Sequence, residues 1–292
     1  MAEVAVMTDS VACIPKELAK QYRIKVVPAA NILVDGKVYI DGETISASEA
    51  YALIKEDPDR FVTSAISPDY LLKTYEELGK RSHQIVFVTI ASTLSAVIRT
   101  ANLAADLLRE KSPEITVRIL DSRACASTQG LVALAAARAA AQGKSPDEIA
   151  RIVESVREKA GGVMMLDTLR YVYRTGRMSK TASRIASIFN IKPINKITAS
   201  GTLELIDKTR KSMDGIERLI NAVGRESGTD SLHFMITHAA APDMAKYLAE
   251  KLKQRFNCLS MIISDYSPVM GYGTGPGALF VGFHPELDLI ER

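Results

Sequence analysis

The sequence predicts an α/β protein with two domains: a Rossmann-like N-terminal domain on a parallel sheet, and a mixed α/β C-terminal domain on a largely antiparallel sheet. The unbroken run of apolar and β-branched residues at 85–90 is typical of a strand buried on both faces, as in a parallel sheet, and the mostly apolar segments at residues 2–7 and 115–120 predict two further strands. A helical pattern follows each run. After residue 160 the pattern changes and residues 191–206 favour a hairpin, so the expected domains are residues 1–160 and 161–292.

Composition excludes several classes of protein. The chain of 292 residues is 47% apolar and 24% charged, as in ordinary globular proteins. No run approaches the ~18 apolar residues that span a bilayer, and the first residues include an acid where a signal peptide carries basic residues. Cys13, Cys125 and Cys258 lack the spacing of a disulfide framework or a zinc site. We therefore expect a cytoplasmic protein with reduced thiols and no metal, whose net charge of +3 is too small to imply nucleic-acid binding.

Turn and cap residues place the elements of the first 80 residues. The Asp-Gly pair at residues 35–36 predicts a hairpin turn, and Ser46 with Glu49 predicts a capping box at the start of a helix. Ser67 is expected to cap a helix over residues 69–78, with Pro68 at its first position. The other elements expected here are a helix at residues 16–22 and strands at residues 24–28, 32–34 and 38–40.

A cluster of hydroxyl side chains, Ser92, Thr93 and Ser95, lies between the strand at residues 85–90 and a helix that ends near residue 108. Ligands of open α/β sheets bind beyond the carboxyl ends of strands, and a helix start adds free N–H groups and a positive dipole end. Such a site suits a small anion, either a carboxylate or a phosphate. The alternative is that Ser92 or Thr93 caps the helix.

Other polar residues are expected near this cluster. The strands at residues 2–7 and 115–120 end in Thr-Asp-Ser and Asp-Ser, and parallel strands end at one edge of a sheet, which favours a cleft there. Thr63 and Ser64 lie in a second hydroxyl-rich turn, where Ser67 already explains the capping of the next helix. An alanine-rich helix at residues 127–142 allows close packing or leaves room for a ligand, and Ser145 with Glu148 predicts a capped helix ending near residue 159.

The second half begins with a basic segment, in which no acid occurs between Asp167 and Glu204. Five of its basic residues recur at helical spacing, namely Arg170, Arg174, Arg177, Lys180 and Arg184. Two further lysines, Lys192 and Lys196, follow them. Gly176 is expected to interrupt the helix. The stripe predicts a docking surface for an acidic partner or a phosphorylated ligand, and a solvated helix face is the alternative.

A glycine-rich segment at residues 271–277 lies near the C-terminus. It lacks the Lys-Ser/Thr pair of a phosphate loop, so we expect it to form a turn that walls a buried ligand. The other elements expected in this half are helices at residues 212–223 and 242–256 and strands at residues 163–166, 232–237, 259–264 and 278–283.

Taken together, these stretches resemble the DegV family of fatty-acid-binding proteins, which serve a bacterial fatty acid kinase. The matching segments follow the family's order over nearly the whole chain: Thr8-Asp9-Ser10, Asp41-Gly42 with Ile45-Ser46, Thr63-Ser64 with Ser67-Pro68, residues 90–101, Asp121-Ser122 with Gly130, Thr175-Gly176-Arg177, Lys192-Pro193-Ile194 and Gly275-Pro276-Gly277-Ala278. The resemblance implies a fatty acid in a buried tunnel between the two domains. It also implies that this chain is a carrier without cofactor or catalysis, whose bound carboxylate a separate kinase subunit phosphorylates.

Family positions also indicate ligand-binding residues. Thr63 and Ser92 match the residues that hold the carboxylate, with Ser64 and Ser95 beside them, and Arg210 matches an arginine after the second-domain hairpin. A histidine that often precedes the family's Thr-Gly-Pro-Gly run is Gly273 here. Tyr272 either supplies a hydroxyl in its place or is a core or rim tyrosine.

Two other functions have some support in the sequence. His238 ends a strand and would suit a small-molecule phosphotransferase related to dihydroxyacetone kinase, although a structural histidine is the alternative. A nucleic-acid binder would use the basic segment, which lacks the neighbouring aromatic residues expected of one. The expected partners are therefore a fatty acid and a kinase subunit and no nucleic acid, with transient membrane contact allowed.

Overall fold

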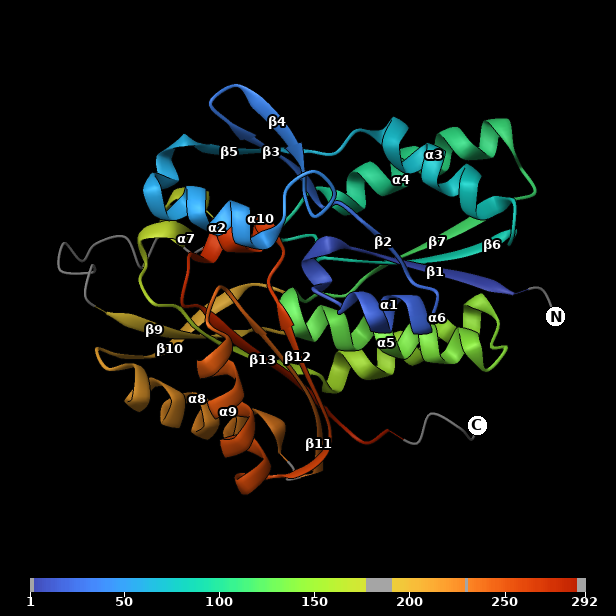
Figure 1. The fold of residues 1–292 in the computed structure, drawn as a ribbon. Coiled ribbons are helices and arrows are strands. Elements are labelled where there is room, and N and C mark those ends of the chain that lie inside the picture. Colours follow the sequence, from blue (N-terminus) through green and yellow to red (C-terminus); the bar gives the residue numbers. More distant parts are fainter. Residues whose placement is uncertain (1–2, 177–190, 229–230, 288–292) are drawn as a thin grey trace.

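The computed structural model describes residues 3–176, 191–228 and 231–287. Its strands form three sheets, of which one is entirely parallel and another is mixed (Figure 1). The predicted α/β fold, with a parallel sheet followed by a largely antiparallel one, is confirmed.

The parallel sheet has four strands in the order β2-β1-β6-β7. Its strands are β1 (Val4–Asp9), β2 (Lys25–Val27), β6 (Gln84–Thr89) and β7 (Thr116–Asp121). Helices α3 (Pro68–Gly79) and α4 (Val97–Lys111) cover one face. On the other face lie α1 (Lys16–Gln21), α5 (Ala126–Ala141) and α6 (Pro146–Lys159) (Figure 1). The predicted strand ends of β1, β6 and β7 therefore do meet at one edge.

A small antiparallel sheet, β4-β3-β5, is inserted between β2 and α3. Its elements are β3 (Ala30–Val34), β4 (Lys37–Ile40), α2 (Ala47–Glu56), the 3₁₀ turn η2 (Pro58–Arg60) and β5 (Phe61–Ala65). Asp35 and Gly36 both have positive φ, 49° and 78°, as a tight hairpin turn requires. The expectation of a turn at Thr63 and Ser64 is wrong, because both residues lie within β5 and pair with β3.

The mixed sheet has six strands in the order β10-β9-β8-β13-β11-β12, and every neighbouring pair except β11-β12 is antiparallel. Its strands are β8 (Gly161–Met165), β9 (Lys192–Ile197), β10 (Leu203–Thr209), β11 (Ser231–His238), β12 (Asn257–Asp265) and β13 (Leu279–Pro285). Helices α8 (Ser212–Ser227) and α9 (Pro242–Arg255) cover its outer face (Figure 1).

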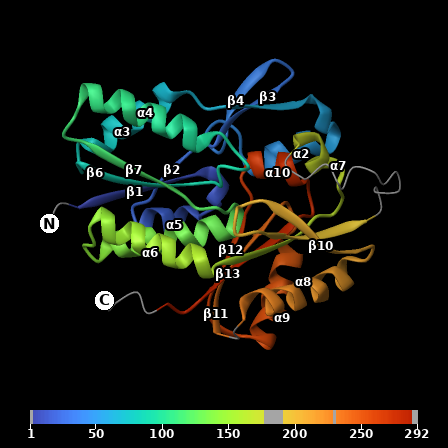
Figure 2. The same ribbon diagram turned by 180° about the vertical axis from the view of Figure 1, so that it is seen from behind.

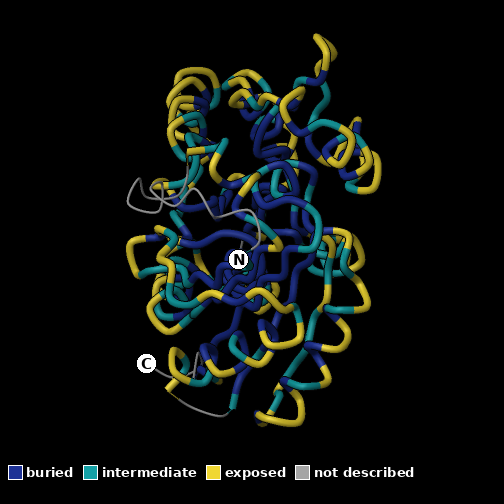
Figure 3. The backbone as a smooth tube through the Cα atoms, turned by 90° about the vertical axis from the view of Figure 1, so that its left-hand side faces the viewer, coloured by how far each residue is buried: buried dark blue, intermediate teal, exposed yellow. Residues whose placement is uncertain are grey.

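Helix α5 lies between the two large sheets and is buried along almost its whole length. The helix packs closely on β13, because a Cβ added at Gly282 would lie 2.5 Å from the backbone nitrogen of Thr128. Figure 3 shows the resulting buried centre, with most exposed residues toward the outside of the molecule. One hydrophobic cluster includes Met7 and Phe87 of the parallel sheet together with Met235 and Phe280 of the mixed sheet. The division at residue 160 stays a prediction, since the core continues across it.

Three short helices gather at the end of the molecule remote from α6 (Figure 2). They are α2, α7 (Arg170–Thr175) and α10 (Pro268–Thr274). The positive φ of Gly176, 67°, ends α7 as expected. Among the described helices, none has both the length and the apolar character needed to cross a membrane.

Capping residues account for several helix starts. The predicted capping boxes of Ser46 with Glu49 and of Ser145 with Glu148 are both present, and Ser67 caps α3. The idea that Ser92 or Thr93 caps α4 is wrong, because this helix begins at Val97.

Candidate ligand-binding site

A cavity of about 200 Å³ lies where the parallel sheet, the small antiparallel sheet and α10 meet. Both halves of the chain contribute to it. Its polar lining consists of hydroxyl and thiol side chains, namely Thr63, Ser64, Ser95, Cys125, Tyr272, Thr175 and Thr274. The remaining lining is mostly apolar and comprises Val11, Ala29, Ala30, Ala65, Ile90, Leu94, Ala96, Met164, Val172, Leu203, Val269 and Met270, together with Gly273. None of the described residues that line the cavity is charged.

Three of the serine and threonine hydroxyls that line the cavity are available as hydrogen-bond donors. Thr175 and Thr274 donate to carbonyl groups of their own helices, Val172 O and Met270 O, each at 2.8 Å. Ser95 instead accepts from the backbone N–H of Val97 at 3.4 Å, which leaves its own O–H free to donate. The hydroxyls of Thr63 and Ser64 have no hydrogen-bond partner among the described residues. These three hydroxyls can therefore donate to an acceptor such as a carboxylate.

The positions of Thr63 and Ser95 follow from local structure. Alternation along β5 puts Thr63 on the face of Phe61, whose ring stacks on that of Tyr272 with centroids 6.2 Å apart. Ser95 lies just before α4, a helix of 15 residues. The positive end of its dipole therefore lies beside the cavity and favours an anion there.

Helix α10 forms one wall of the cavity through Tyr272, Gly273 and Thr274. The prediction of a turn over this segment is wrong for its first half, which is helical. Gly271 allows this helix to pack against α2, because an added Cβ would overlap the ring of Tyr51. Tyr51 in turn donates a hydrogen bond to the carbonyl of Tyr266 at 2.9 Å, which holds α2 against the start of α10.

The structure places Ser92 outside the cavity. Its side chain is exposed, and its backbone N–H donates to Asp121 Oδ2 at 3.2 Å. Thr93 is also turned away and donates to the carbonyl of Gly201 at 2.9 Å, which joins this loop to the β9–β10 hairpin. Of the hydroxyl cluster predicted at this strand end, Ser95 alone lines the cavity.

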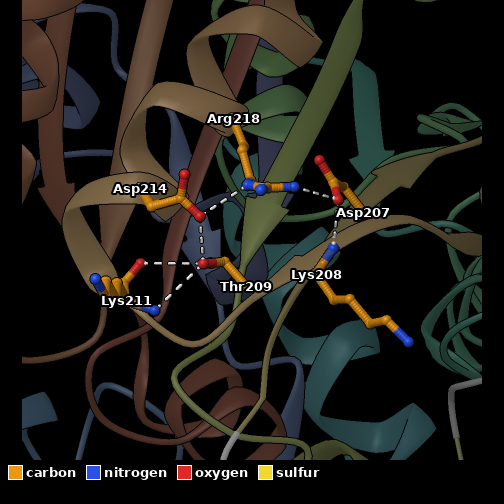
Figure 4. A network of polar contacts seen from close by, with 6 residues as sticks. All are labelled: Asp207, Lys208, Thr209, Lys211, Asp214 and Arg218. Atoms are coloured by element: carbon orange, nitrogen blue, oxygen red, sulfur yellow. Dashed lines mark hydrogen bonds and ion pairs between the residues drawn. The ribbon is translucent and has the colours of Figure 1, made fainter.

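Arg210 is also exposed and is not among the lining residues. It lies in the turn between β10 and α8, which a polar network holds in place (Figure 4). In this network Arg218 pairs with Asp207 at 2.9 Å and with Asp214 at 2.8 Å, and Asp214 also accepts from the hydroxyl of Thr209. Both acids are thus paired with Arg218, and Arg210 forms no ion pair with a described residue.

The basic segment is less free than its sequence indicates. Arg170 is exposed, whereas the side chain of Arg174 is only 20% exposed and pairs with Asp59 at 2.8 Å. Lys192 pairs with Asp167, and Lys196 pairs with Glu226 at 3.2 Å. The other three predicted docking residues lie outside the described part of the chain; they are Arg177, Lys180 and Arg184.

Two buried carboxyl groups, those of Asp9 and Asp41, lie behind the residues that line the cavity. Asp9 accepts hydrogen bonds from the backbone N–H groups of Ile90 at 2.7 Å and Val11 at 3.1 Å, so this strand-end acid supports the cavity wall instead of facing a ligand. Asp41 accepts from the hydroxyl of Ser10. Burial raises the pKa of both Asp9 and Asp41 to about 6.

Comparison with known proteins identifies the family. The sequence profile described as "Uncharacterised protein, DegV family" matches residues 3–286. The chain belongs to the DegV family. It is 32% identical over 288 residues to a DegV domain-containing protein of Caldanaerobacter subterraneus, which covers 98% of this chain and 100% of that protein. A DegV domain-containing protein of Streptomyces coelicolor is 30% identical over 280 residues, 95% of this chain and 97% of the other.

Solved structures of DegV proteins have the same fold. A fatty-acid-binding DegV family protein from Thermus thermophilus superposes with a TM-score of 0.87 at 22% identity, covering 98% of this chain and 100% of that one. DegV of Bacillus subtilis, described as a fatty acid binding protein, gives 0.85 at 24% identity with coverages of 98% and 100%. A DegV family protein from Eubacterium eligens loaded with heptadecanoic acid gives 0.85 at 21% identity with coverages of 97% and 100%.

Other reactive groups of this DegV protein lie in structural settings. His238 is 5% exposed, lies 3.2 Å from Asp265 Oδ1, and does not line the cavity. Burial lowers the pKa of this histidine. Cys125 lines the cavity, and burial raises its pKa to about 12, so its thiol stays protonated. In the described part of the chain, no group of three histidine, cysteine or acidic residues is arranged to hold a metal ion.

A larger groove of about 1020 Å³ lies on the other side of Asp41 in this DegV protein. Its walls are α1, the segment around α2 and the loop before α10, and its rim carries Lys16, Glu17 and Asp265. None of the ligand-binding residues predicted from the sequence lines it. We therefore regard the smaller cavity, with its uncommitted hydroxyl donors, as the candidate site.

Sequence reasoning missed some lining residues. Thr274 lies in the glycine-rich segment, where its hydroxyl could have been considered with Tyr272. Thr175 lies within the basic segment, whose charges predicted a docking surface and not a cavity wall. Cys125 and Met164 carry no signal that distinguishes them from ordinary core residues.

Proposed function

We propose that this protein binds a long-chain fatty acid, with the tail in the cavity and the carboxylate on the hydroxyls of Thr63, Ser64 and Ser95. The observation that carries the proposal is an uncharged, mostly apolar chamber with three uncommitted hydroxyl donors beside the positive end of α4. Solved DegV proteins of the same fold support it, because two are described as binding fatty acids and a third is loaded with heptadecanoic acid.

The energetics suit this kind of ligand. Burying about fourteen methylene groups contributes on the order of 11 kcal/mol before the costs of binding are subtracted. A hydrogen bond to a charged group contributes about 1.5–3 kcal/mol. The tail therefore supplies most of the affinity, and the hydroxyls select a terminal acid. Met164 and Met270 add unbranched side chains that can adapt to tails of different shape.

We further infer that the protein is a carrier without catalysis of its own, which presents the carboxylate to a fatty acid kinase that converts it to an acyl phosphate. The cavity residues support a carrier, because they offer hydrogen-bond donors but no ionised nucleophile or base. The kinase would dock on the basic segment of the sequence that begins at Arg170. Such a carrier would act in the cytoplasm and contact membranes transiently to exchange lipid.

Native mass spectrometry of the freshly purified protein tests the ligand. A mass increment equal to one fatty acid, lost on organic extraction, is the expected result. A protein that carries no lipid, binds no added fatty acid and phosphorylates a small polyol would instead support the phosphotransferase alternative. His238, the residue that suggested this alternative, does not line the cavity.

A second experiment tests the docking surface. Reversing Arg170 and Arg177 to glutamate (R170E/R177E) should abolish kinase-dependent acyl-phosphate formation and leave fatty-acid binding unchanged. Unimpaired turnover by this variant would show that the kinase docks elsewhere.

A further inference from the structure

Arg174 and Asp59 form an ion pair that points from the cavity wall toward solvent. Arg174 Nε lies 2.8 Å from Asp59 Oδ1, but the two side chains differ in exposure, 20% for the arginine and 74% for the aspartate. The cation is therefore on the inner side and its counter-ion on the outer side. Water screens the aspartate much more than the arginine, so the pair presents net positive potential inward.

The inner side of this pair is the cavity wall. The guanidinium carbon of Arg174 lies 5.5 Å from the ring centroid of Tyr272, which lines the cavity. Val172 and Thr175, on the same helix as Arg174, line it too. The Nη1 group of Arg174 is buried and has no hydrogen-bond partner among the described residues. The positive charge is thus one aromatic ring away from the ligand space.

Neighbouring charges do not cancel this effect. Arg60, next to Asp59, pairs with Asp35 and lies 3.9 Å from Glu56, so its own acids neutralise it. The residues that line the cavity are uncharged. Arg174 is therefore a largely buried cation in contact with a residue that lines the chamber.

We propose that Arg174 is a specificity-determining residue, which makes the cavity prefer an anionic head group over a neutral one of the same shape, and that Asp59 moderates this preference. The charge acts through the Tyr272 ring and the low-dielectric wall, without direct contact with the ligand. This inference rests on the proposed function, because it assumes a ligand with a terminal carboxylate. It also gives Arg174 a role different from docking.

The opposite charges of the pair provide a sharp test. If Arg174 acts by charge, removing its charge lowers the preference for an anion, whereas removing the charge of Asp59 raises it. If the pair is merely a structural link between η2 and α7, both changes should weaken binding of charged and neutral ligands alike. The sign of the Asp59 effect therefore separates the two roles.

The experiment compares hexadecanoic acid with hexadecanamide, which has the same shape but no charge, by calorimetry on lipid-free protein. The ratio of the two dissociation constants is measured for the wild type, R174M and D59N. R60M is the matched control, since Arg60 adjoins Asp59 but pairs with other acids. We expect R174M to lower the preference for the acid about tenfold, which corresponds to about 1.4 kcal/mol. D59N should raise it about threefold, and R60M should leave it unchanged.

Each outcome bears on the proposal. An unchanged ratio in R174M, or a lower ratio in D59N, would overturn it. If R174M does not fold, the sign of the D59N effect still decides. A wild-type protein that binds neither probe would refute the proposed function itself, and this inference with it, whereas binding of both probes with a ratio insensitive to Arg174 refutes the inference alone.

Discussion

Asp41 Oδ1 accepts a hydrogen bond from the backbone N–H of Val269 at 3.0 Å, although the two residues lie 228 positions apart in the chain. The bond joins the end of the β3–β4 hairpin to α10, and Val269 lines the cavity. One carboxyl group thus fixes the wall contributed by the C-terminal half to the small sheet of the N-terminal half.

This carboxyl group makes stability depend on pH. Burial raises the pKa of Asp41 to about 6 from an ordinary value of 3.8, so between these values the folded protein holds a proton that the unfolded chain releases. Its contribution to stability is therefore present at low pH and is lost as the pH rises through about 6. In D41N this contribution should disappear, and the difference between the two pH profiles should reach about 3 kcal/mol for two pKa units.

Urea unfolding of the wild type and D41N from about pH 4 to pH 7 measures this. Asp9, whose pKa is also about 6, is present in both proteins and titrates in both profiles, and its charge raises the pKa of Asp41. Parallel pH profiles would contradict the assignment.

Ser95 and Ser92 should differ in their effect on ligand binding. We expect S95A to weaken binding of a fatty acid by about tenfold or more, because a hydrogen bond to a charged group is lost. S92A is the matched control and should bind as the wild type does, since Ser92 lies outside the cavity. Calorimetric titration of both variants checks this, and a larger loss in S92A would mean that the head group lies at the other serine.

Thr63 should act in the same way as Ser95. T63V keeps the branched shape of the side chain and removes the hydroxyl, so the affinity for a fatty acid should fall while that for an apolar alkane of equal length is retained. Equal losses for both ligands would indicate that the substitution disturbs β5 instead.

Gly282 should tolerate no side chain. An added Cβ would lie 2.5 Å from Thr128 N and 2.7 Å from Ser127 C, which are backbone atoms of a buried helix. We expect G282A to lower the free energy of unfolding by about 1–3 kcal/mol. G224A is the control, because a Cβ there meets nothing closer than Phe256 at 3.7 Å, and an alanine within α8 should stabilise by about 0.5–1 kcal/mol. Denaturant unfolding of both variants measures the contrast.

Thr93 should contribute to the contact between the two halves. T93V removes the hydrogen bond to the carbonyl of Gly201 and should cost about 1 kcal/mol, whereas T93S retains the hydroxyl and should cost less. Equal stabilities of T93V and the wild type in urea would show that this bond adds nothing.

Much of the fold could be predicted because its signals are local. Capping boxes such as that of Ser46 with Glu49 depend on residues three positions apart, and buried strands depend on short apolar runs. The start of α4 could not be located, since Ser92 and Thr93 are good caps by residue type, yet their backbone N–H and hydroxyl groups bind Asp121 and Gly201 elsewhere in the fold. Chain spacing does not reveal such partners.

The site was predictable in kind but not in every residue. Thr63 and Ser64 were identified as unexplained hydroxyls, and they do line the cavity, but the polar, short β5 gave no strand signal. Arg174 belonged to an acid-free stretch of sequence, and its counter-ion Asp59 comes from a distant turn. Whether a charge is solvated or paired depends on such long-range contacts.

The position of α5 between the two large sheets implies that the halves of this chain are mutually dependent. A fragment ending at residue 160 would expose the side of α5 that packs against β13, and the complementary fragment would lack the helix that covers its inner sheet face. Neither piece should be a viable module for fusion or exchange between relatives, so recombination is expected to preserve this family as whole chains.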